Sequence, residues 1–401
     1  MARVRCPRDP DGAPARGLAD LSARTEFEDD GTDKLDIVDR CINSLHEKRR
    51  STREAGMEGL VGLLEGFIPM DRIDYRCLTI FFRCRASLNT GSAREALLAY
   101  RAIGLLALTV GDNADCSKEI LTSTLQLPTL MKTLRAPSGD AKVVAALNCL
   151  AIVTFAAARR PEDVEPSIRA IWGVIRLSRA DNRTNPVVLI TALSAWALLL
   201  TTLGDLRTYP YAWKEATIPF RDLAELLNTD DPALLMASGE ALAVCAELSL
   251  MQHATPEDME TLGIKVSDLA SGTHGNDKKL TGQIRAMFQQ IAAIMKRGQC
   301  SYEELIPTTW RQRCVLMVSK WARLAQLNFV KRFLGKAFIK HLHGNPLFRE
   351  SSFNNVAANE TSDLPVKKSK QHKFGREKQY TAALKRDRMI SWESKNDFLL
   401  L

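Results

Sequence analysis

The feature that most constrains the fold of this chain is a regular spacing of helix-start signals. A helix start is favoured where a side-chain oxygen caps free backbone N–H groups, or where proline takes the first helical position. Such signals precede the long apolar segments at Ser51, Ser92, Ser138, Asn185, Asp231 and Asn276. The intervals between them are 41, 46, 47, 46 and 45 residues. This period is typical of HEAT and armadillo repeats, which are helical units of about 40–47 residues.

Further apolar segments between these starts predict a second set of helices, over residues 71–86, 116–134, 161–179, 218–227 and 255–270. Because one helix pair cannot bury its apolar face alone, each pair must stack on the next. Aromatic residues make up only 6% of the chain, Ala and Leu are abundant, and no long alternating strand pattern occurs. We therefore expect an all-α fold, an armadillo/HEAT-like α-solenoid of about six helix pairs. An irregular helical bundle is the alternative.

Two glycines interrupt the apolar faces of predicted helices. Gly104 lies beside Leu108, and Gly239 lies beside Leu242. Glycine inside a helix costs about 1 kcal/mol relative to alanine, which suggests a packing reason for its presence. We expect both glycines to let packed helices approach closely.

Residues 184–204 form a stretch of the chain without a single charged side chain. The stretch contains Asn185, Thr191 and Ser194, and it lies among other apolar helical segments. A helix that is apolar on all sides is expected in the middle of a large helical protein. We interpret it as a buried core helix, with a membrane span as the alternative, and we expect no membrane partner.

The positive charge of the chain is concentrated near its C-terminus. Residues 310–349 contain nine Lys or Arg and no Asp or Glu, and residues 366–388 contain nine against two acids. Because the whole chain has a formal charge of +8, the remaining residues carry −8. A basic segment raises the local affinity for polyanions whatever its fold. The charge pattern thus favours a polyanionic partner for the C-terminal region.

Composition and patterning divide the chain into four parts. Residues 1–33 are rich in Pro, Gly, Arg and Asp, lack the apolar core of a secretory signal, and are expected to be disordered. Residues 34–300 hold the helical repeats, and 301–353 predict a short basic helical domain. Residues 354–401 predict a basic, largely disordered tail.

Signatures of catalysis and metal binding are absent from the sequence. There is no phosphate-binding loop, dinucleotide fingerprint, H-E-x-x-H helix or serine-hydrolase elbow. The nine cysteines form no C-x-x-C pair and indicate reduced thiols in an intracellular compartment. Cys77 and Cys84 are expected in the core, and His341 with His343 makes a weak zinc motif. We expect no enzyme activity, metal, cofactor or small-molecule substrate.

The basic segment after residue 310 combines cations with aromatic rings on one predicted helix. At 100° per residue, one apolar stripe contains Leu327, Val330, Leu334 and Phe338, whereas Phe329, Arg332, Phe333 and Lys336 fall in a separate arc. Cations neutralise phosphates and exposed rings stack on bases, so this arc is typical of nucleic-acid binding. The alternative is that both phenylalanines are core residues and the cations are only solvated.

These considerations define a set of candidate nucleic-acid-binding residues. In the helical segment they are Arg323, Phe329, Lys331, Arg332, Phe333, Lys336, Lys340 and His341. In the tail they are Lys367, Lys368 and Lys370, which fit nucleic-acid contact or nuclear import. A solubilising role is the alternative interpretation of the tail.

Several motifs resemble those of the interferon-related developmental regulator family. The N-terminal matches are residues 47–54 (EKRRSTRE), 91–95 (GSARE), 104–109 (GLLALT), 194–198 (SAWAL) and 238–243 (SGEALA). The C-terminal match is more specific and includes Trp321, Gln326, Asn328, Phe329, Phe333, Gly335, Phe338, His341, Leu342 and Asn345. Together the matches span roughly residues 34–353.

The resemblance implies an armadillo-like domain followed by a short basic domain, without catalytic activity. Members of the family are associated with binding to translationally idle ribosomes and with transcriptional co-regulation in corepressor assemblies. Two hypotheses follow. The favoured one is a regulator of translation that binds ribosomes and rRNA through the basic segment, and the alternative is a nuclear protein–protein adaptor. We expect the protein in the cytoplasm and the nucleus.

Overall fold

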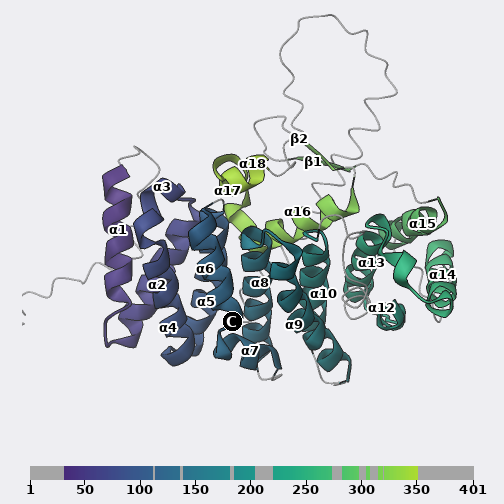
Figure 1. Cartoon of the computed structure of the whole chain (residues 1–401), viewed down its shortest axis with the longest axis horizontal. Coiled ribbons are helices and arrows are strands. Elements are labelled where there is room, and N and C mark those ends of the chain that lie inside the picture. Colours follow the sequence, from purple (N-terminus) through teal and green to yellow (C-terminus); the bar gives the residue numbers. More distant parts are fainter. Residues whose placement is uncertain are drawn as a thin grey trace, which may run out of the picture.

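Helices stacked side by side in one row make up most of the structure (Figure 1). The computed structural model describes residues 31–111, 113–135, 139–180, 185–203, 220–272, 282–297, 304–307, 315–318 and 320–350. Within these ranges the only sheet is an antiparallel pair, in which β1 (Glu304–Pro307) aligns Glu304 with Val318 of β2 (Val315–Val318). The solenoid itself is all-α, as the sequence predicts.

In the part of the chain that the structure describes, the solenoid has six units, each with an outer segment followed by an inner helix. The outer segments are α1 (Gly31–Ser44), α3 (Met70–Ile73) with η2 (Asp74–Arg76) and α4 (Cys77–Thr90), α6 (Ala114–Leu125) with α7 (Pro128–Arg135), α9 (Pro161–Ala180), α12 (Phe220–Leu226) and α14 (Pro256–Ser271). The inner helices are α2 (Arg50–Glu65), α5 (Ala93–Val110), α8 (Asp140–Ala157), α10 (Pro186–Leu200), α13 (Pro232–Glu247) and α15 (Gly282–Arg297). Consecutive inner helices pack against one another along the row. The short η4 (Leu250–His253) connects the fifth and sixth units.

Side-chain caps begin several helices where the sequence predicts them. Ser92 and Glu95 form a complete capping box at α5, and the Asn185 side chain accepts the Val187 N–H at 3.0 Å. The carboxylate of Asp231 accepts the Ala233 N–H at 2.8 Å. Ser51 is a wrong prediction, because α2 begins at Arg50 and Ser51 already lies in its first turn. Ser138 and Asn276 lie outside the described residues.

The predicted single helix over residues 116–134 is two helices in the structure. The helix α6 ends at Leu125 and α7 begins at Pro128. Proline lacks the N–H that would continue the hydrogen-bond ladder, and it disfavours helical geometry at the residue before it. The unit therefore has three helices, α6, α7 and α8.

The uncharged stretch is confirmed as a core helix. In α10 every residue from Thr191 to Leu200 is buried, and the helix packs between α8 and α13. By length and composition alone α8 could span a membrane, but it packs between α5 and α10 with 61% of its apolar window buried. A position in the middle of the stack accounts for the apolar character of both helices.

Polar pairs tie neighbouring units together at intervals close to the repeat period. Glu65 accepts from Arg101 at 2.7 Å, 36 residues later, and Asp74 accepts from Asn113 at 2.9 Å, 39 residues later. In the fourth and fifth units, Arg179 Nη1 lies 2.6 Å from the carboxylate of Asp222, 43 residues later. Each of these pairs joins one unit to the next, so they help to fix how the units stack.

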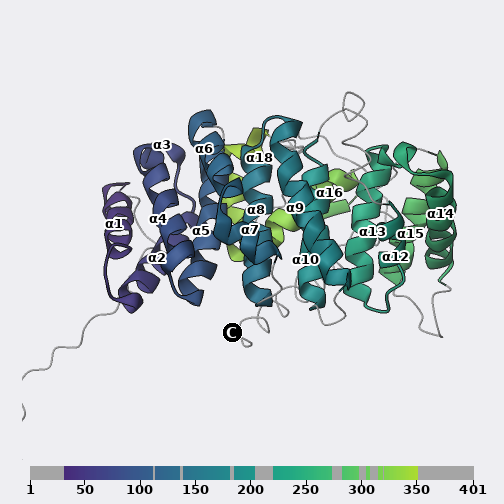
Figure 2. The ribbon, with the colours of Figure 1, turned by 60° about the horizontal axis from the view of Figure 1, so that its bottom comes forward.

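A second run of helices returns along the inner helices and is called the strap, residues 321–350. It consists of α16 (Trp321–Leu334), η5 (Gly335–Ala337), α17 (Phe338–Gly344) and α18 (Pro346–Glu350). Figures 1 and 2 show it running across the stack towards the N-terminal units, and in Figure 2 it lies behind the stacked helices. Residues 321–350 of the predicted basic helical domain (301–353) are thus helical and packed on the solenoid, whereas β1 and β2, within the same predicted domain, are strands and not helix.

Candidate nucleic-acid interface

The first half of the strap is fastened to the solenoid by three polar contacts. The Ala322 N–H donates to the Glu247 carboxylate at 2.7 Å, which supplies an acceptor at the start of α16. The Asn328 amide donates to Glu240 at 2.9 Å, and the Gln326 amide donates to Thr201 at 2.8 Å. These acceptors lie on α13 and at the end of α10, the two inner helices that α16 contacts most.

The end of α16 rests on α5, where the ring of Phe333 occupies the space left by Gly104. A Cβ atom placed on Gly104 would lie 2.6 Å from Phe333 Cζ, so a larger residue there would push the ring away. The Arg101 guanidinium lies 4.4 Å from the centroid of the same ring and donates to the Phe333 carbonyl. Because Arg101 also pairs with Glu65, one guanidinium joins α2, α5 and the strap.

The predicted close approaches at the two glycines are both confirmed. At Gly239 a Cβ atom would lie 2.2 Å from Met287 Cε and 3.1 Å from Phe288 on the next inner helix. Gly239 therefore serves the stacking of units. Gly104 instead serves the docking of the strap, which its sequence surroundings did not indicate.

The far end of the strap is held by buried neutral side chains. The His341 Nε2–H donates to the Leu64 carbonyl at 3.0 Å, and its ring packs edge-on against Phe67 at 5.4 Å between centroids. Burial lowers the pKa of His341 to about 4, so the ring is neutral at neutral pH. The Asn345 amide donates to the Leu108 carbonyl at 2.8 Å. These bonds satisfy carbonyl oxygens on α2 and α5.

The burial of three candidate residues contradicts their assignment to a nucleic-acid surface. Phe329 is 1% exposed, Phe333 is 6% exposed and His341 is fully buried. The strap contacts several inner helices at once, so its buried arc is wider than the single apolar stripe of the helical-wheel argument. These side chains anchor the strap, and in this structure neither phenylalanine presents a face on which a base could stack.

The remaining cations of the strap lie on its outer side. Arg332, Lys336 and Lys340 are exposed and follow one another at intervals of four residues, whereas Arg323 and Lys331 are half-buried. The Arg332 guanidinium lies 5.1 Å from the Phe329 ring centroid, where burial lowers its pKa and the Glu240 carboxylate partly offsets that shift. Lys336 and Lys340 make no ion pair with any residue in the described ranges.

The tail candidates Lys367, Lys368 and Lys370 lie outside the described residues, as do residues 1–30 and 354–401. Residues 31–33, placed in the disordered segment by the sequence, are the start of α1. Within the described residues, no group of three or more His, Cys, Asp or Glu side chains is arranged to hold a metal ion. The exposed cations of the strap are therefore the candidate site that the structure places in space.

The sequence did not indicate that two of the family-like motifs, residues 47–54 and 91–95, contact each other. Arg53 and Glu95, from the motifs at 47–54 and 91–95, form an ion pair of 3.0 Å. The Ser92 hydroxyl donates to Glu54 at 2.6 Å. Their separation of 38–42 residues is close to the repeat period, so the spacing held a signal for this contact.

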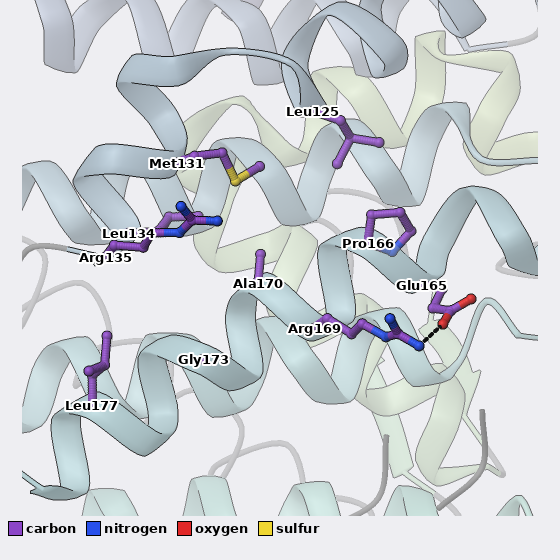
Figure 3. A pocket seen from close by; sticks show the side chains of 10 residues that line it. All are labelled: Leu125, Met131, Leu134, Arg135, Glu165, Pro166, Arg169, Ala170, Gly173 and Leu177. Carbon is purple, nitrogen blue, oxygen red and sulfur yellow. Dashed lines mark ion pairs between the residues drawn. The ribbon is translucent and has the colours of Figure 1, made fainter. Parts of the chain in front are cut away.

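An outer groove of about 550 Å³ opens between α6, α7 and α9 (Figure 3). Apolar lining comes from Leu125, Met131, Leu134, Pro166, Ala170, Gly173 and Leu177. Arg135 and an ion pair between Arg169 and Glu165 supply its polar lining (Figure 3). The groove lies between outer segments, and none of its lining residues belongs to the strap.

Six stacked units with a C-terminal strap define the chain as an armadillo-like α-solenoid. The family model "Interferon-related developmental regulator" matches residues 16–296, and the chain belongs to this family.

Two relatives show the extent of the similarity. Interferon-related developmental regulator 2 of Mus musculus is 27% identical over 323 residues, covering 77% of this chain and 70% of the relative. Interferon-related developmental regulator 1 of Homo sapiens is 24% identical over 358 residues, covering 83% and 76%. Among solved structures, a designed armadillo repeat protein for modular peptide recognition is 15% identical, with a TM-score of 0.45 over 64% of this chain and 98% of its own.

Proposed function

We propose that this protein is a non-catalytic regulator that binds ribosomes through rRNA and tunes translation. The observation that carries the proposal is the row of exposed cations Arg332, Lys336 and Lys340 on the outer side of the docked strap. No Asp or Glu occurs between residues 310 and 349, so the strap itself offers no neutralising acid along this stretch. Family membership supports a regulatory role.

The docking of the strap makes its cations suitable for a phosphate backbone. Binding would still restrict these side chains, but the backbone that carries them, in α16, η5 and α17, is already held by the solenoid and loses little further freedom. Contacts to phosphates position a protein on nucleic acid and need no aromatic ring. The buried Phe329 and Phe333 therefore contribute by fixing the helix, and the cations supply the affinity.

The test replaces the three cations and keeps every anchor residue; of the three, Arg332 also lies against the anchor Phe329, at 5.1 Å from its ring centroid. The variant Arg332→Gln/Lys336→Gln/Lys340→Gln removes three positive charges from the strap, and Lys118→Gln/Lys132→Gln/Arg135→Gln removes three exposed charges from α6 and α7. On low-salt sucrose gradients of cell lysate, the control should sediment with 60S and 80S particles and the strap variant should stay at the top. Equal sedimentation of both variants would refute the strap as the ribosome-binding site.

The outer groove favours a second candidate function, that of a nuclear adaptor. The strap covers part of the inner-helix face, whereas the groove between α7 and α9 is open and apolar. Arg135 makes no ion pair with a described residue, so the groove suits an apolar protein segment that carries a carboxylate. Corepressor subunits are the class of partner that this hypothesis names.

A different substitution, in the groove, tests the adaptor hypothesis. A Cβ atom on Gly173 would meet no other atom within 4 Å, so Gly173→Leu places a side chain in the groove without a clash. The hypothesis predicts that Gly173→Leu loses co-purifying nuclear proteins and keeps ribosome sedimentation. Exclusion of the tagged protein from nuclei while nuclear export is blocked would contradict it.

A further inference from the structure

Two thiols from neighbouring units meet at the seam between the second and third units. Cys77 is the first residue of α4 and Cys116 lies in the first turn of α6, 39 residues later. Their Sγ atoms are 2.8 Å apart, and both cysteines are free thiols in this structure. A disulfide has an S–S distance of about 2.05 Å, so the sulfurs need to close by roughly 0.8 Å to form one.

A second contact holds the same seam in register. Three residues before each cysteine, the Asn113 amide donates to the Asp74 carboxylate at 2.9 Å. The Asn113 side-chain oxygen also accepts the Cys116 N–H at 3.1 Å, which caps α6. The starts of α4 and α6 are therefore held together next to the thiols. The position of the two sulfurs is fixed by these two helices and not by a flexible loop.

The two thiols differ in their access to solvent. Cys77 is fully buried, and burial together with the adjacent Cys116 thiol raises its pKa to about 12. Cys116 is half-buried, so it is the sulfur that an oxidant in solution reaches first. An accessible thiol beside a buried second thiol is the arrangement of an attacking and a resolving cysteine.

We propose that Cys77 and Cys116 form a reversible, peroxide-driven disulfide that covalently joins the second and third units. The inference rests on the geometry of this seam and does not depend on the proposed function. Intracellular disulfides are generally transient or redox-sensing.

The chemistry balances with a hydroperoxide as the two-electron oxidant. The Cys116 thiolate attacks one peroxide oxygen, the O–O bond breaks, and the leaving oxygen takes a proton, which leaves a sulfenic acid on Cys116. Cys77 Sγ then attacks Cys116 Sγ, the S–O bond breaks, and the Cys77 proton leaves with the hydroxyl group as water. Each sulfur gives up one electron, and a reducing thiol restores both.

The test uses the full-length reduced protein and hydrogen peroxide. After free thiols are alkylated, a tryptic digest without reductant should contain residues 77–83 joined to 102–118, with two hydrogen atoms fewer than the separate peptides. Dithiothreitol should release the two peptides. Since the bond closes a loop between two units, the melting temperature of the oxidised protein should rise by roughly 5 °C.

Three variants make the result decisive. Cys116→Ser should abolish the joined peptide and the shift in melting temperature, whereas Cys245→Ser, at a fully buried thiol on α13, should leave both unchanged. In Cys77→Ala the sulfenic acid on Cys116 should persist and react with dimedone. Peroxide treatment that leaves both thiols alkylatable, or that converts Cys116 directly to sulfinic acid without the joined peptide, would overturn the proposal.

Discussion

The stack of units and the strap are both helical, but they are held by contacts of different range. Within the stack, polar partners such as Glu65 and Arg101 lie 36 residues apart. Across the strap, Ala322 and Glu247 are 75 residues apart, and His341 and Leu64 are 277 apart. Units can therefore stack one after another, whereas the strap needs an assembled surface before it gains its contacts. The comparison marks the strap as a separately docked element.

The two sides of the strap also differ in chemistry. Its inner side carries Phe329, Phe333 and the neutral His341, which are buried, and its outer side carries exposed cations. Substitutions can remove the buried anchors of the strap while keeping its positive charge, or remove the charge while keeping the anchors. Variants of each type separate the structural role of the strap from its proposed role in binding.

The largest expected effect comes from Phe333→Ala, which removes the ring that packs on Gly104. Truncation of a buried phenylalanine typically costs about 3–5 kcal/mol. Because Phe333 belongs to the docked element, hydrogen exchange should accelerate throughout residues 321–348 and stay slow in α8 and α10. Equal loss of protection in α8 and α10 would show that strap and stack unfold as one unit.

A smaller loss of stability is expected at acidic pH, because His341 is protonated more readily in the unfolded chain. Its pKa is near 6.5 in the unfolded chain and about 4 when docked, so between these values the unfolded state binds the extra proton. The free energy of unfolding therefore falls as the pH drops below about 6.5, by ~2 kcal/mol at pH 5. The groups that face this ring are the Leu64 carbonyl, Phe67 and Arg101, which is itself paired with Glu65.

The matched variant for the acid effect is His341→Gln, whose amide can donate to the Leu64 carbonyl but does not titrate. Urea unfolding at pH 7 and pH 5, followed through exchange of the strap amides, should show a smaller difference for this variant than for the natural sequence. An identical pH dependence would assign the acid effect to another group.

The smallest effect is expected within the stack, from Asp222→Asn. The ion pair of Asp222 with Arg179 joins the fourth and fifth units, but both side chains are partly exposed, at 30% and 21%. Such pairs contribute up to about 1 kcal/mol. The variant should unfold at slightly lower urea concentration with the strap amides unchanged. A selective loss of strap protection would break the distinction between the two regions.

Much of the solenoid could be predicted from the sequence because its signals are local. Cap residues such as Ser92 and Asn185 act within one helical turn, and the repeat period follows from their spacing. The break before Pro128 is also encoded locally, by the proline itself, but the long apolar pattern of residues 116–134 hides it. Local rules account for helices and for their order.

The docking of the strap could not be predicted in the same way. The helical periodicity of residues 321–338 shows two arcs of side chains, but it does not say how many surfaces cover them. Phe333 and Gly104 are 229 residues apart, and only the assembled stack brings them together. The charge of the strap was evident from composition, and the side on which each cation lies was not.

The central claim, that strap cations bind ribosomal phosphates, is tested most directly by the salt dependence of ribosome affinity. Each phosphate contact contributes about 0.7–0.9 to the slope of log affinity against log salt concentration. The slope of Arg332→Gln/Lys336→Gln/Lys340→Gln should be shallower than that of the natural sequence by about 2–3. The α6 and α7 control variant should keep the natural slope. A strap variant that keeps both the natural slope and the natural affinity would contradict the claim.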